Sequence, residues 1–570
     1  MKANKIIPDT SDNIPENAPK TICLIQLTRI GDILQTYQAA NIFKQQYPHY
    51  KLILIARTRF AHPLSFLLRN VFDKTYYLDN NVLKIDSSDT LADLVNSCKT
   101  VTDNLKNESI SVLINFSFSK SSGYLTSIIP AEHKMGLMYD TANNVVIKDK
   151  WSQYIYSNVM GGPLNPFNLV DIFKSMLGHN LPALSRERPS FKKVSHILLH
   201  PFASHDKKMW KINKWEEILY QLLKNFPETT ISIVGSQEES IHGTGIDTSP
   251  LLQKYKDRIN NIIGKTSIEE IYNLLDNVDL FIGHDSMVGH LASIKNTPSV
   301  TISLGTVRFR ETSPYGENNY TVTPQTNCFP CFMKDKCEFF QCHYDISYQV
   351  IYSILKEYIE TGSITKEYQL KNGSCFHLNA VAIYKSKISS IGFLQLDNLL
   401  EEKYSVNDVF SLLYRISWQF VLNNSEEPQK FLTLTTKSHQ ILLNSLSGLQ
   451  HLYELSDFGK KYSRYILEEI SSSVPRLEKI KEYSAKIDEI DGLTKLVKQT
   501  HPHLSPLIDF YTVQKGNLPG DNIVELTESS FLLYNDAINT ISVLYELMEK
   551  TIAEHKTKNK ITENSTEQNY

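Results

Sequence analysis

The sequence is poor in cysteine and almost free of net charge. Only seven of its 570 residues are cysteine, too few for a scaffold held together by disulfides. Fifty-nine basic residues nearly balance 62 acidic ones, so the net charge of −3 offers no broad attraction to nucleic acid or an anionic membrane. No segment approaches the ~18 uninterrupted apolar residues of a spanning helix, and the N-terminus lacks the apolar stretch of a signal peptide. These absences predict a cytoplasmic protein without a transmembrane segment that binds no nucleic acid.

Ample apolar material is present. Hydrophobic residues make up 41% of the chain and aromatic residues 10%, as in ordinary globular proteins. A chain of 570 residues exceeds the roughly 250–300 that one hydrophobic core organises. The sequence therefore predicts at least two domains, and more plausibly three.

Two consecutive blocks alternate strands with helices. Residues 20–185 contain the apolar segments TICLIQLT, KLILIAR and VLINFSF, and residues 190–362 contain HILLHP, TTISIVG, NNIIG, VDLFIGH and PSVTISL. Helical patterns separate these segments, so each block is predicted to form a parallel, doubly wound α/β sheet. Such sheets bind ligands at the carboxyl ends of their strands, which places the expected site in a cleft between the two domains.

The pattern changes after residue 362. A helix is predicted after Ser405, where Ser405 and Asp408 have the spacing of a capping box. Apolar residues at spacings of three and four predict another helix near the end of the chain: Tyr534, Ala537, Ile541, Leu544 and Met548. We therefore expect an all-α accessory domain over residues 363–552 and a disordered polar tail over 553–570.

Polar residues with possible chemistry follow several predicted strands. In the first block the turn TRIGD places Asp32 at the start of a helix, where it can cap the helix or face the cleft. In the second block a loop of small and polar residues contains Ser204 and Lys208, which suit a phosphate. Glu238 and Glu239 follow the next strand, where a carboxylate can accept hydrogen bonds from ribose hydroxyls. Asp285, Ser286 and His290 follow a later strand and can converge on one ligand.

The order of these loops resembles glycosyltransferase family 9, the ADP-heptose-type heptosyltransferases. The resemblance covers about residues 20–360 and rests on LTRIGD, HPFASHDKKMW, IVGSQEE, IIGKTSIEEIYNLLDNVDLFIGHDSMVGHLA and TSPYGENN. It implies a GT-B fold of two Rossmann-like domains, with a nucleotide-diphospho-sugar bound by the second. It also implies an inverting transfer that needs no metal for its chemistry.

The resemblance assigns a role to each matching residue. Asp32 matches the general base that deprotonates the acceptor hydroxyl, and Lys208 matches the lysine that binds the donor diphosphate. Ser204 lies in the matching phosphate loop. Either Glu238 or Glu239 matches the carboxylate that holds the ribose. Three residues match the signature that contacts sugar and phosphate: Asp285, Ser286 and His290.

The chain departs from the family pattern at two places. Met287 stands where the signature has glycine, and the Gly-Pro-Thr-Asp-Pro loop is replaced by Leu304–Arg308. Both departures bear on how the sugar and diphosphate are held. They support one alternative interpretation, a catalytically silent GT-B-fold scaffold. A second alternative is a GT-B sugar-nucleotide epimerase, which shares the two-sheet cleft.

Four of the seven cysteines lie close together, at Cys328, Cys331, Cys337 and Cys342. Four thiolates at such spacing can form a closed tetrahedral site for structural zinc or iron, with His343 as a substitute ligand. The alternative is four reduced cysteines packed in a loop. The resemblance extends more loosely here to autotransporter heptosyltransferases with an iron-binding cysteine finger.

The sequence as a whole predicts a heptosyltransferase-type glycosyltransferase. The expected donor is a nucleotide-diphospho-sugar such as ADP-heptose. The expected acceptor is a lipopolysaccharide core or a protein such as an autotransporter or flagellin. The protein is expected in the cytoplasm or at the periphery of the inner membrane, and as a homo-oligomer.

Overall fold

The computed structural model describes residues 20–79, 99, 102–162, 164–178, 193–332, 334–365, 378–400, 404–429 and 432–567. The boundary between the two predicted α/β blocks, residues 186–189, lies outside these ranges. The chain divides into two compact units. Unit 1 contains residues 1–134 and 167–401, and unit 2 contains residues 135–166 and 402–570.

The first half of unit 1 is a five-stranded sheet in the order β3-β2-β1-β4-β5. Its central strand β1 pairs in parallel with β2 and β4, and β2 pairs in parallel with β3. The strands are short and fully apolar at the centre, as expected where helices cover both faces. The elements are β1 (Thr21–Gln26), α1 (Ile30–Gln46), β2 (Lys51–Arg57), α2 (Thr58–Ala61), α3 (Ser65–Leu68), β3 (Lys74–Leu78), β4 (Ile110–Asn115), α6 (Lys120–Ile128), β5 (His133–Met135) and α8 (Leu169–Leu177).

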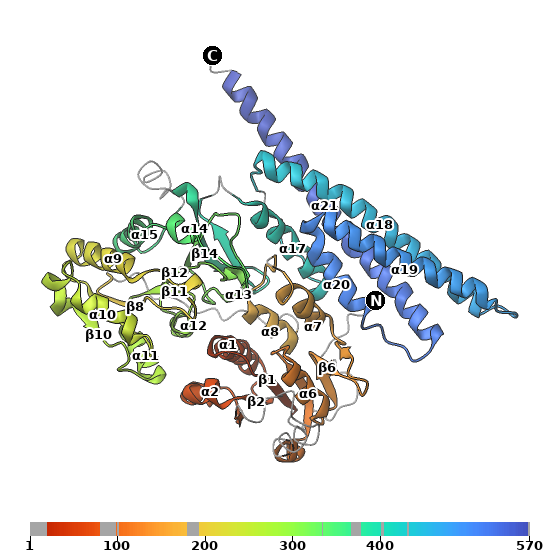
Figure 1. Ribbon diagram of the computed structural model, residues 1–570, viewed down its shortest axis with the longest axis horizontal. Helices are drawn as coiled ribbons and strands as arrows, with labels where there is room; N and C mark the ends of the chain where they lie inside the picture. Colours follow the sequence, from red (N-terminus) through yellow and green to blue (C-terminus); the bar gives the residue numbers. More distant parts are fainter. Residues whose placement is uncertain are drawn as a thin grey trace. The chain divides into compact units, whose positions relative to one another are not determined.

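The second half of unit 1 is an eight-stranded sheet in the order β10-β9-β8-β11-β12-β13-β14-β15. Its first six strands are parallel: β8 (His196–His200), β9 (Thr230–Ile233), β10 (Ile259–Asn261), β11 (Leu280–His284), β12 (Ser299–Ile302) and β13 (Tyr320–Pro324). The intervening helices are α9 (Ile212–Asn225), α10 (Ser240–Thr248), α11 (Ile268–Leu274), α12 (Met287–Ile294), α13 (Phe309–Thr312), α14 (Gln341–Asp345) and α15 (Tyr348–Thr361). Two consecutive Rossmann-like sheets confirm the predicted GT-B-like α/β fold (Figure 1).

The start of the all-α region differs from the expectation. Residues after 363 do not pass directly into helices, because β14 (Val381–Ile388) and β15 (Leu394–Asn398) extend the second sheet. β14 pairs antiparallel with β13, and β15 pairs antiparallel with β14. Strand β13 would otherwise leave its backbone groups unpaired at the sheet edge, and Ala382 and Tyr384 of β14 bury apolar surface against Val307 and Phe309.

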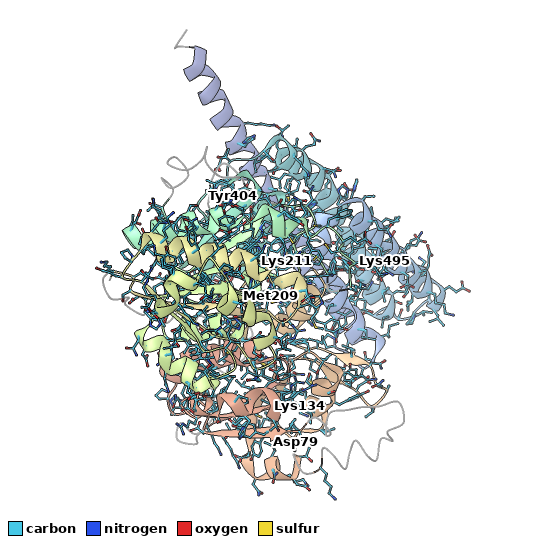
Figure 2. The ribbon with its side chains drawn as sticks, turned by 60° about the vertical axis from the view of Figure 1, so that its left-hand side comes forward. Asp79, Lys134, Met209, Lys211, Tyr404 and Lys495 are labelled. Carbon is cyan, nitrogen blue, oxygen red and sulfur yellow. The ribbon has the colours of Figure 1, made fainter. Side chains whose placement is uncertain are left out.

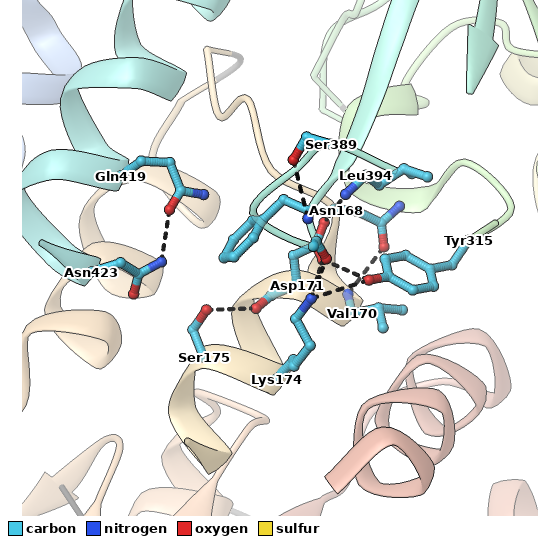
Figure 3. A network of polar contacts seen from close by, with 12 residues as sticks. Asn168, Val170, Asp171, Lys174, Ser175, Tyr315, Ser389, Leu394, Gln419 and Asn423 are labelled. Atoms are coloured by element: carbon cyan, nitrogen blue, oxygen red, sulfur yellow. Dashed lines mark hydrogen bonds and ion pairs between the residues drawn. The ribbon is translucent and has the colours of Figure 1, made fainter. Parts of the chain in front are cut away.

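A buried polar network ties the β14–β15 hairpin to α8 (Figure 3). Lys174 and Asp171 form an ion pair of 3.1 Å with at most 1% of either side chain exposed. The Tyr315 hydroxyl donates to Asp171 Oδ1 at 2.7 Å, the Leu394 N–H donates to Asp171 Oδ2 at 2.8 Å, and Lys174 donates to the carbonyl of Gly392. The carboxylate and the ammonium thus both have several partners, as buried charges require.

Unit 2 is largely helical and includes residues 135–166, an insertion within the first predicted domain. The insertion contains β6 (Met138–Tyr139), β7 (Val145–Val146), α7 (Lys150–Tyr154) and the π-helix η3 (Ile155–Val159). Its Trp151 donates to Asn423 of the helical region, and Tyr154 packs on Trp418 with ring centroids 5.5 Å apart. Residues 135–166 were expected within the 20–185 domain. They belong to unit 2 because their aromatic side chains are buried there, which local periodicity does not reveal.

Three long helices of unit 2 run side by side in Figure 1: α18 (Thr436–Ile470), α19 (Leu477–Thr500) and α21 (Ile523–Glu567). Two shorter helices, α17 (Val406–Asn423) and α20 (Ser505–Lys515), complete the unit. The predicted capping box is confirmed, because Ser405 and Asp408 bond each other's backbone N–H groups. Helix α21 continues past Ile552, where we expected the chain to become disordered; this stretch contains no glycine or proline to end the helix.

Candidate functional site

The predicted donor-site residues lie at one edge of the second sheet. Strands β9, β8 and β11 are neighbours and parallel, so the loops that follow them meet at the same edge. The loop after β8 contains Lys208, the loop after β9 contains Glu239, and the loop after β11 contains Asp285. The order of the sheet thus brings together residues that are far apart in the sequence.

Lys208 and Asp285 contact each other across this edge. Lys208 Nζ lies 3.5 Å from Asp285 Oδ2, and about one seventh of each side chain is exposed (13% and 14%). Ser204, expected in the same phosphate loop, is exposed to solvent. An ammonium beside a carboxylate is held in place but keeps donors for an anion that enters from solvent.

The end of the loop after β8 is anchored by His284, the last residue of β11. The backbone N–H of Trp210 donates to Nε2 of His284 at 3.0 Å, so Nδ1 carries the ring proton and donates to the carbonyl of Ile302 at 3.3 Å. Burial lowers the pKa of His284 to about 3, so the ring is neutral. Met209 and Lys211 flank the anchored tryptophan, just before α9 (Figure 2).

A histidine that the sequence analysis did not single out connects two predicted residues. His200, the last residue of β8, has Nδ1 at 3.0 Å from Ser286 Oγ and Nε2 at 3.6 Å from Glu239 Oε2. Burial raises the pKa of Glu239, but the His200 ring and the Ser236 N–H outweigh burial and hold that pKa below its usual range. Glu238 is exposed.

Asp32 lies near His290, across the two halves of unit 1. Its carboxylate accepts a hydrogen bond from the Arg29 N–H at 3.0 Å, so it does stabilise the start of α1. A Cβ built on the adjacent Gly31 would lie 3.5 Å from the His290 ring. Burial lowers the pKa of His290, and the carboxylates of Asp285 and Asp32 oppose this shift. The two alternatives for Asp32, a helix cap and a carboxylate near the site, are thus compatible.

His290 itself has an unused polar atom. Its Nδ1 is buried and has no hydrogen-bond partner among the residues that the structure describes. A small cavity next to the ring is lined in part by Asp285, Ser286, Ser303 and Ser313. A buried donor or acceptor without a partner costs stability unless a ligand or water completes it.

A larger cavity of about 510 Å³ is lined by residues from both halves of unit 1. The first half contributes His62, Pro63, Ser65 and Phe66. The second half contributes residues from the ends of β9 and β10: Ser236, Gln237, Gly264, Thr266, Ser267, Ile268 and Glu269. The buried hydroxyl of Thr266 has no partner within the described part of the chain. The volume of this cavity suits a small organic molecule.

The loop that departs from the family pattern packs against the loop after β8. Gly305 has φ +58°, and a Cβ there would lie 2.2 Å from the carbonyl oxygen of Lys207. No side chain fits at this close approach, so glycine is required. The second departure, Met287, is the first residue of α12 and is partly exposed.

The four clustered cysteines surround one cavity of about 220 Å³. They are not gathered as metal ligands: no three His, Cys, Asp or Glu side chains of the described residues are placed to hold an ion. His343, the expected substitute ligand, instead bonds the Lys207 carbonyl through Nε2 at 3.0 Å. Burial raises the pKa of Cys342 to about 11, so this thiol is protonated near neutral pH.

Lys207, in the loop after β8, contacts this cysteine loop. Its buried Nζ donates to the carbonyl of Phe332 at 3.3 Å and to the carbonyl of Asp335. The Cys331 N–H donates to the Gly305 carbonyl at 3.0 Å. Lys207 and His200 are the main residues that sequence reasoning missed. The available signal for His200 was its place at a strand end, the same position that drew attention to Asp285.

Comparison with known proteins agrees with the motifs. Residues 99–340 match the family model for glycosyltransferase family 9 (heptosyltransferase). The chain is 25% identical over 305 residues to lipopolysaccharide heptosyltransferase 1 of Campylobacter coli, covering 51% of this chain and 85% of that protein. It is 21% identical over 288 residues to lipopolysaccharide heptosyltransferase 3 of Escherichia coli K12, covering 48% and 79%.

Among solved structures, the chain is similar to ADP-heptose lipopolysaccharide heptosyltransferase II of E. coli. The TM-score is 0.44 at 14% identity, over 60% of this chain and 99% of that one. The family match over residues 99–340 and the curated relatives support a glycosyltransferase of the family 9, heptosyltransferase type. Within the described ranges, no helix has the length and apolar character needed to cross a membrane.

Proposed function

We propose that the protein transfers a heptose-type sugar from a nucleotide diphosphate to an acceptor hydroxyl, with inversion at the anomeric carbon. The observation that carries this proposal is the convergence of Asp32 and His290 from opposite halves of unit 1, beside Asp285 and Lys208. A single displacement needs a base on one face of the sugar and charge stabilisation on the other. These residues offer both.

In this proposal Asp32 removes the proton from the acceptor hydroxyl as that oxygen attacks the anomeric carbon. The carboxylate is partly exposed, so an acceptor can reach it from solvent. Oδ2 accepts from the Arg29 N–H, which orients the group, and Oδ1 is assigned to take up the proton. The base is thus held in position before the acceptor arrives.

The leaving diphosphate is placed beside Lys208, Ser286 and the first turn of α12. The lysine ammonium and the helix N-terminus both favour the negative charge that develops as the glycosidic bond breaks. The nucleoside is placed in the 510 Å³ cavity, where the Thr266 hydroxyl and the loop after β9 can bind it. Glu239 is the ribose carboxylate in this arrangement.

Replacement of Asp32 tests the chemical step. Asp32→Asn keeps the shape and loses the base, so transfer should fall at least about 100-fold. The nucleotide diphosphate should still bind, as measured by calorimetry. Asp103→Asn removes an exposed carboxylate paired with Lys106 and is the matched control. Full transfer by Asp32→Asn would refute the assignment.

The acceptor is proposed to be a lipopolysaccharide core saccharide or a protein. Incubation with a radiolabelled nucleotide sugar and each acceptor class, followed by mass spectrometry, distinguishes them. A changed nucleotide sugar without a new glycosidic bond would indicate an epimerase. Nucleotide binding without any turnover would indicate a silent scaffold.

We further propose that the cysteine loop binds structural zinc or iron. The support is the position of four thiols around one cavity. Metal binding would require rotation of these side chains toward the cavity centre and the loss of their protons, because thiolates are the ligands. Elemental analysis of purified protein should find about one equivalent of metal. A Cys337→Ser, Cys342→Ser variant should lose it, and a metal-free wild type would refute the proposal.

A further inference from the structure

His200 occupies a position between the two sets of groups proposed to bind the nucleotide. It ends β8, at the sheet edge where the loops converge, and only 7% of it is exposed. Each ring nitrogen contacts a different loop: Nδ1 contacts Ser286 after β11, and Nε2 contacts Glu239 after β9. His200 takes no direct part in the proposed transfer chemistry.

The ring is held in a defined orientation. Phe202 packs against it edge to face, with centroids 5.8 Å apart and planes at 82°. Gly235, at the end of β9, leaves room for that phenylalanine, because a Cβ there would lie 2.7 Å from the Phe202 ring. A ring fixed in this way sets the distance between the Ser286 hydroxyl and the Glu239 carboxylate.

The two candidate ribose carboxylates differ in burial and in the number of groups that hold them in place. Glu239 is partly buried and accepts from the Ser236 N–H at 2.7 Å in addition to contacting His200. Glu238 is exposed. A carboxylate with two fixed partners loses less conformational entropy when it accepts hydrogen bonds from a ligand.

We propose that His200 is a positioning residue that holds Glu239 and Ser286 at the spacing of a ribose and its diphosphate. The site thereby distinguishes ribonucleoside diphosphates from 2′-deoxy and monophosphate analogues. This inference rests on the proposed nucleotide-sugar donor and adds the residue that sets its selectivity. His200 itself need not touch the ligand.

The two nitrogens can be tested separately. In His200→Asn the side-chain amide lies near the position of Nδ1 and can keep the contact with Ser286. In His200→Gln the amide reaches the position of Nε2 and can keep the contact with Glu239. The control is His196→Gln at the opposite end of β8, where the two ring nitrogens contact Asn277 and Ser232.

Calorimetric titration of the full-length protein with ADP, 2′-deoxy-ADP and AMP gives two ratios for each variant. The wild type should prefer ADP to 2′-deoxy-ADP by about tenfold, the size of one hydrogen bond to a charged group. His200→Asn should bring the ratio of ADP to 2′-deoxy-ADP affinity near one and keep the preference for ADP over AMP. His200→Gln should keep the preference for ADP over 2′-deoxy-ADP and reduce the preference for ADP over AMP severalfold. The His196 control should change neither preference.

A purely structural role for His200 predicts a different result. Both variants would then weaken all three ligands equally and leave both ratios at wild-type values, which would overturn the inference. If both His200 variants fail to fold, Ser286→Ala replaces them. Ser286 is assigned to the diphosphate, but its loss should release the His200 ring and so lower the preference for ADP over 2′-deoxy-ADP. An unchanged preference would overturn the inference. A wild type that binds no nucleoside diphosphate would refute the proposed function and this inference together.

Discussion

Lys208 Nζ lies 3.5 Å from Asp285 Oδ2, so the lysine proposed to meet the donor diphosphate is already paired with a carboxylate from the neighbouring strand. The pair joins the loop after β8 to the loop after β11. The carboxylate keeps the long lysine side chain at the sheet edge before a ligand arrives. This preorganisation reduces the entropy lost on binding.

Removal of the Lys208 charge should weaken diphosphate binding selectively. Lys208→Met is expected to lower the affinity for ADP by about tenfold or more, because a hydrogen bond to a charged group is lost. The affinity for AMP should fall less. Lys211→Met, three residues further on and exposed, is the control (Figure 2). Equal losses for both ligands would argue against a diphosphate contact.

Lys207 should control the order of the cysteine loop. Lys207→Met removes the donor to the carbonyls of Phe332 and Asp335. We expect hydrogen exchange and thiol alkylation of Cys342 to become about 10-fold faster, since loss of a charged hydrogen bond costs roughly 1.5–3 kcal/mol. The exposed Lys334, replaced by Met, is the comparison. Unchanged alkylation in Lys207→Met would show that the loop is held by other contacts.

The buried network of α8 should dominate the stability of unit 1. Lys174→Met leaves the Asp171 carboxylate buried without its cation, and loss of one partner of such a pair costs about 3–5 kcal/mol. Urea denaturation should show this loss. Lys356→Met breaks an exposed pair with Glu360 and should cost less than about 0.5 kcal/mol. Similar costs for the two variants would mean that the network contributes little.

His284 should make stability depend on pH. Its pKa is about 3 in the folded protein and about 6.5 in an unfolded chain. Between pH 3 and 6.5 the unfolded state therefore binds one more proton than the folded state. The stability that depends on the neutral His284 ring is complete above about pH 6.5 and is lost as the pH falls toward 3. The slope reaches about 1.4 kcal/mol per pH unit.

His284→Gln should remove that part of the slope. The comparison is of urea midpoints at pH 7.5 and 5.0 for the wild type and the variant. The control is His49→Gln, since the His49 ring is exposed. A variant with the wild-type slope would mean that His284 does not remain neutral in the folded protein.

Much of the fold was predictable because it follows local patterns. Apolar segments bounded by turns became β1, β8, β9, β11 and β12, and the Ser405 capping box began α17 as predicted. The positions of Asp285 and Lys208 in loops that follow strands came from the same patterns, because the chain must leave a parallel sheet at its carboxyl edge. Their assigned roles remain predictions.

Other features depend on contacts that no local pattern encodes. The hairpin of β14 and β15 has ordinary strand character, but only the free edge of β13 decides where it adds. Residues 135–166 leave the first α/β half because Trp151 and Tyr154 find partners in the helices of unit 2.

The sequence by itself determined the class of the protein, since ordered motifs at strand ends record the chemistry that a family shares. The tertiary structure alone decided that His200 joins Ser286 to Glu239 and that Asp32 lies near His290. These residues are separated by tens to hundreds of positions in the chain. Their proximity arises from strand order and from the packing of the two halves of unit 1, and neither is a property of local residue spacing.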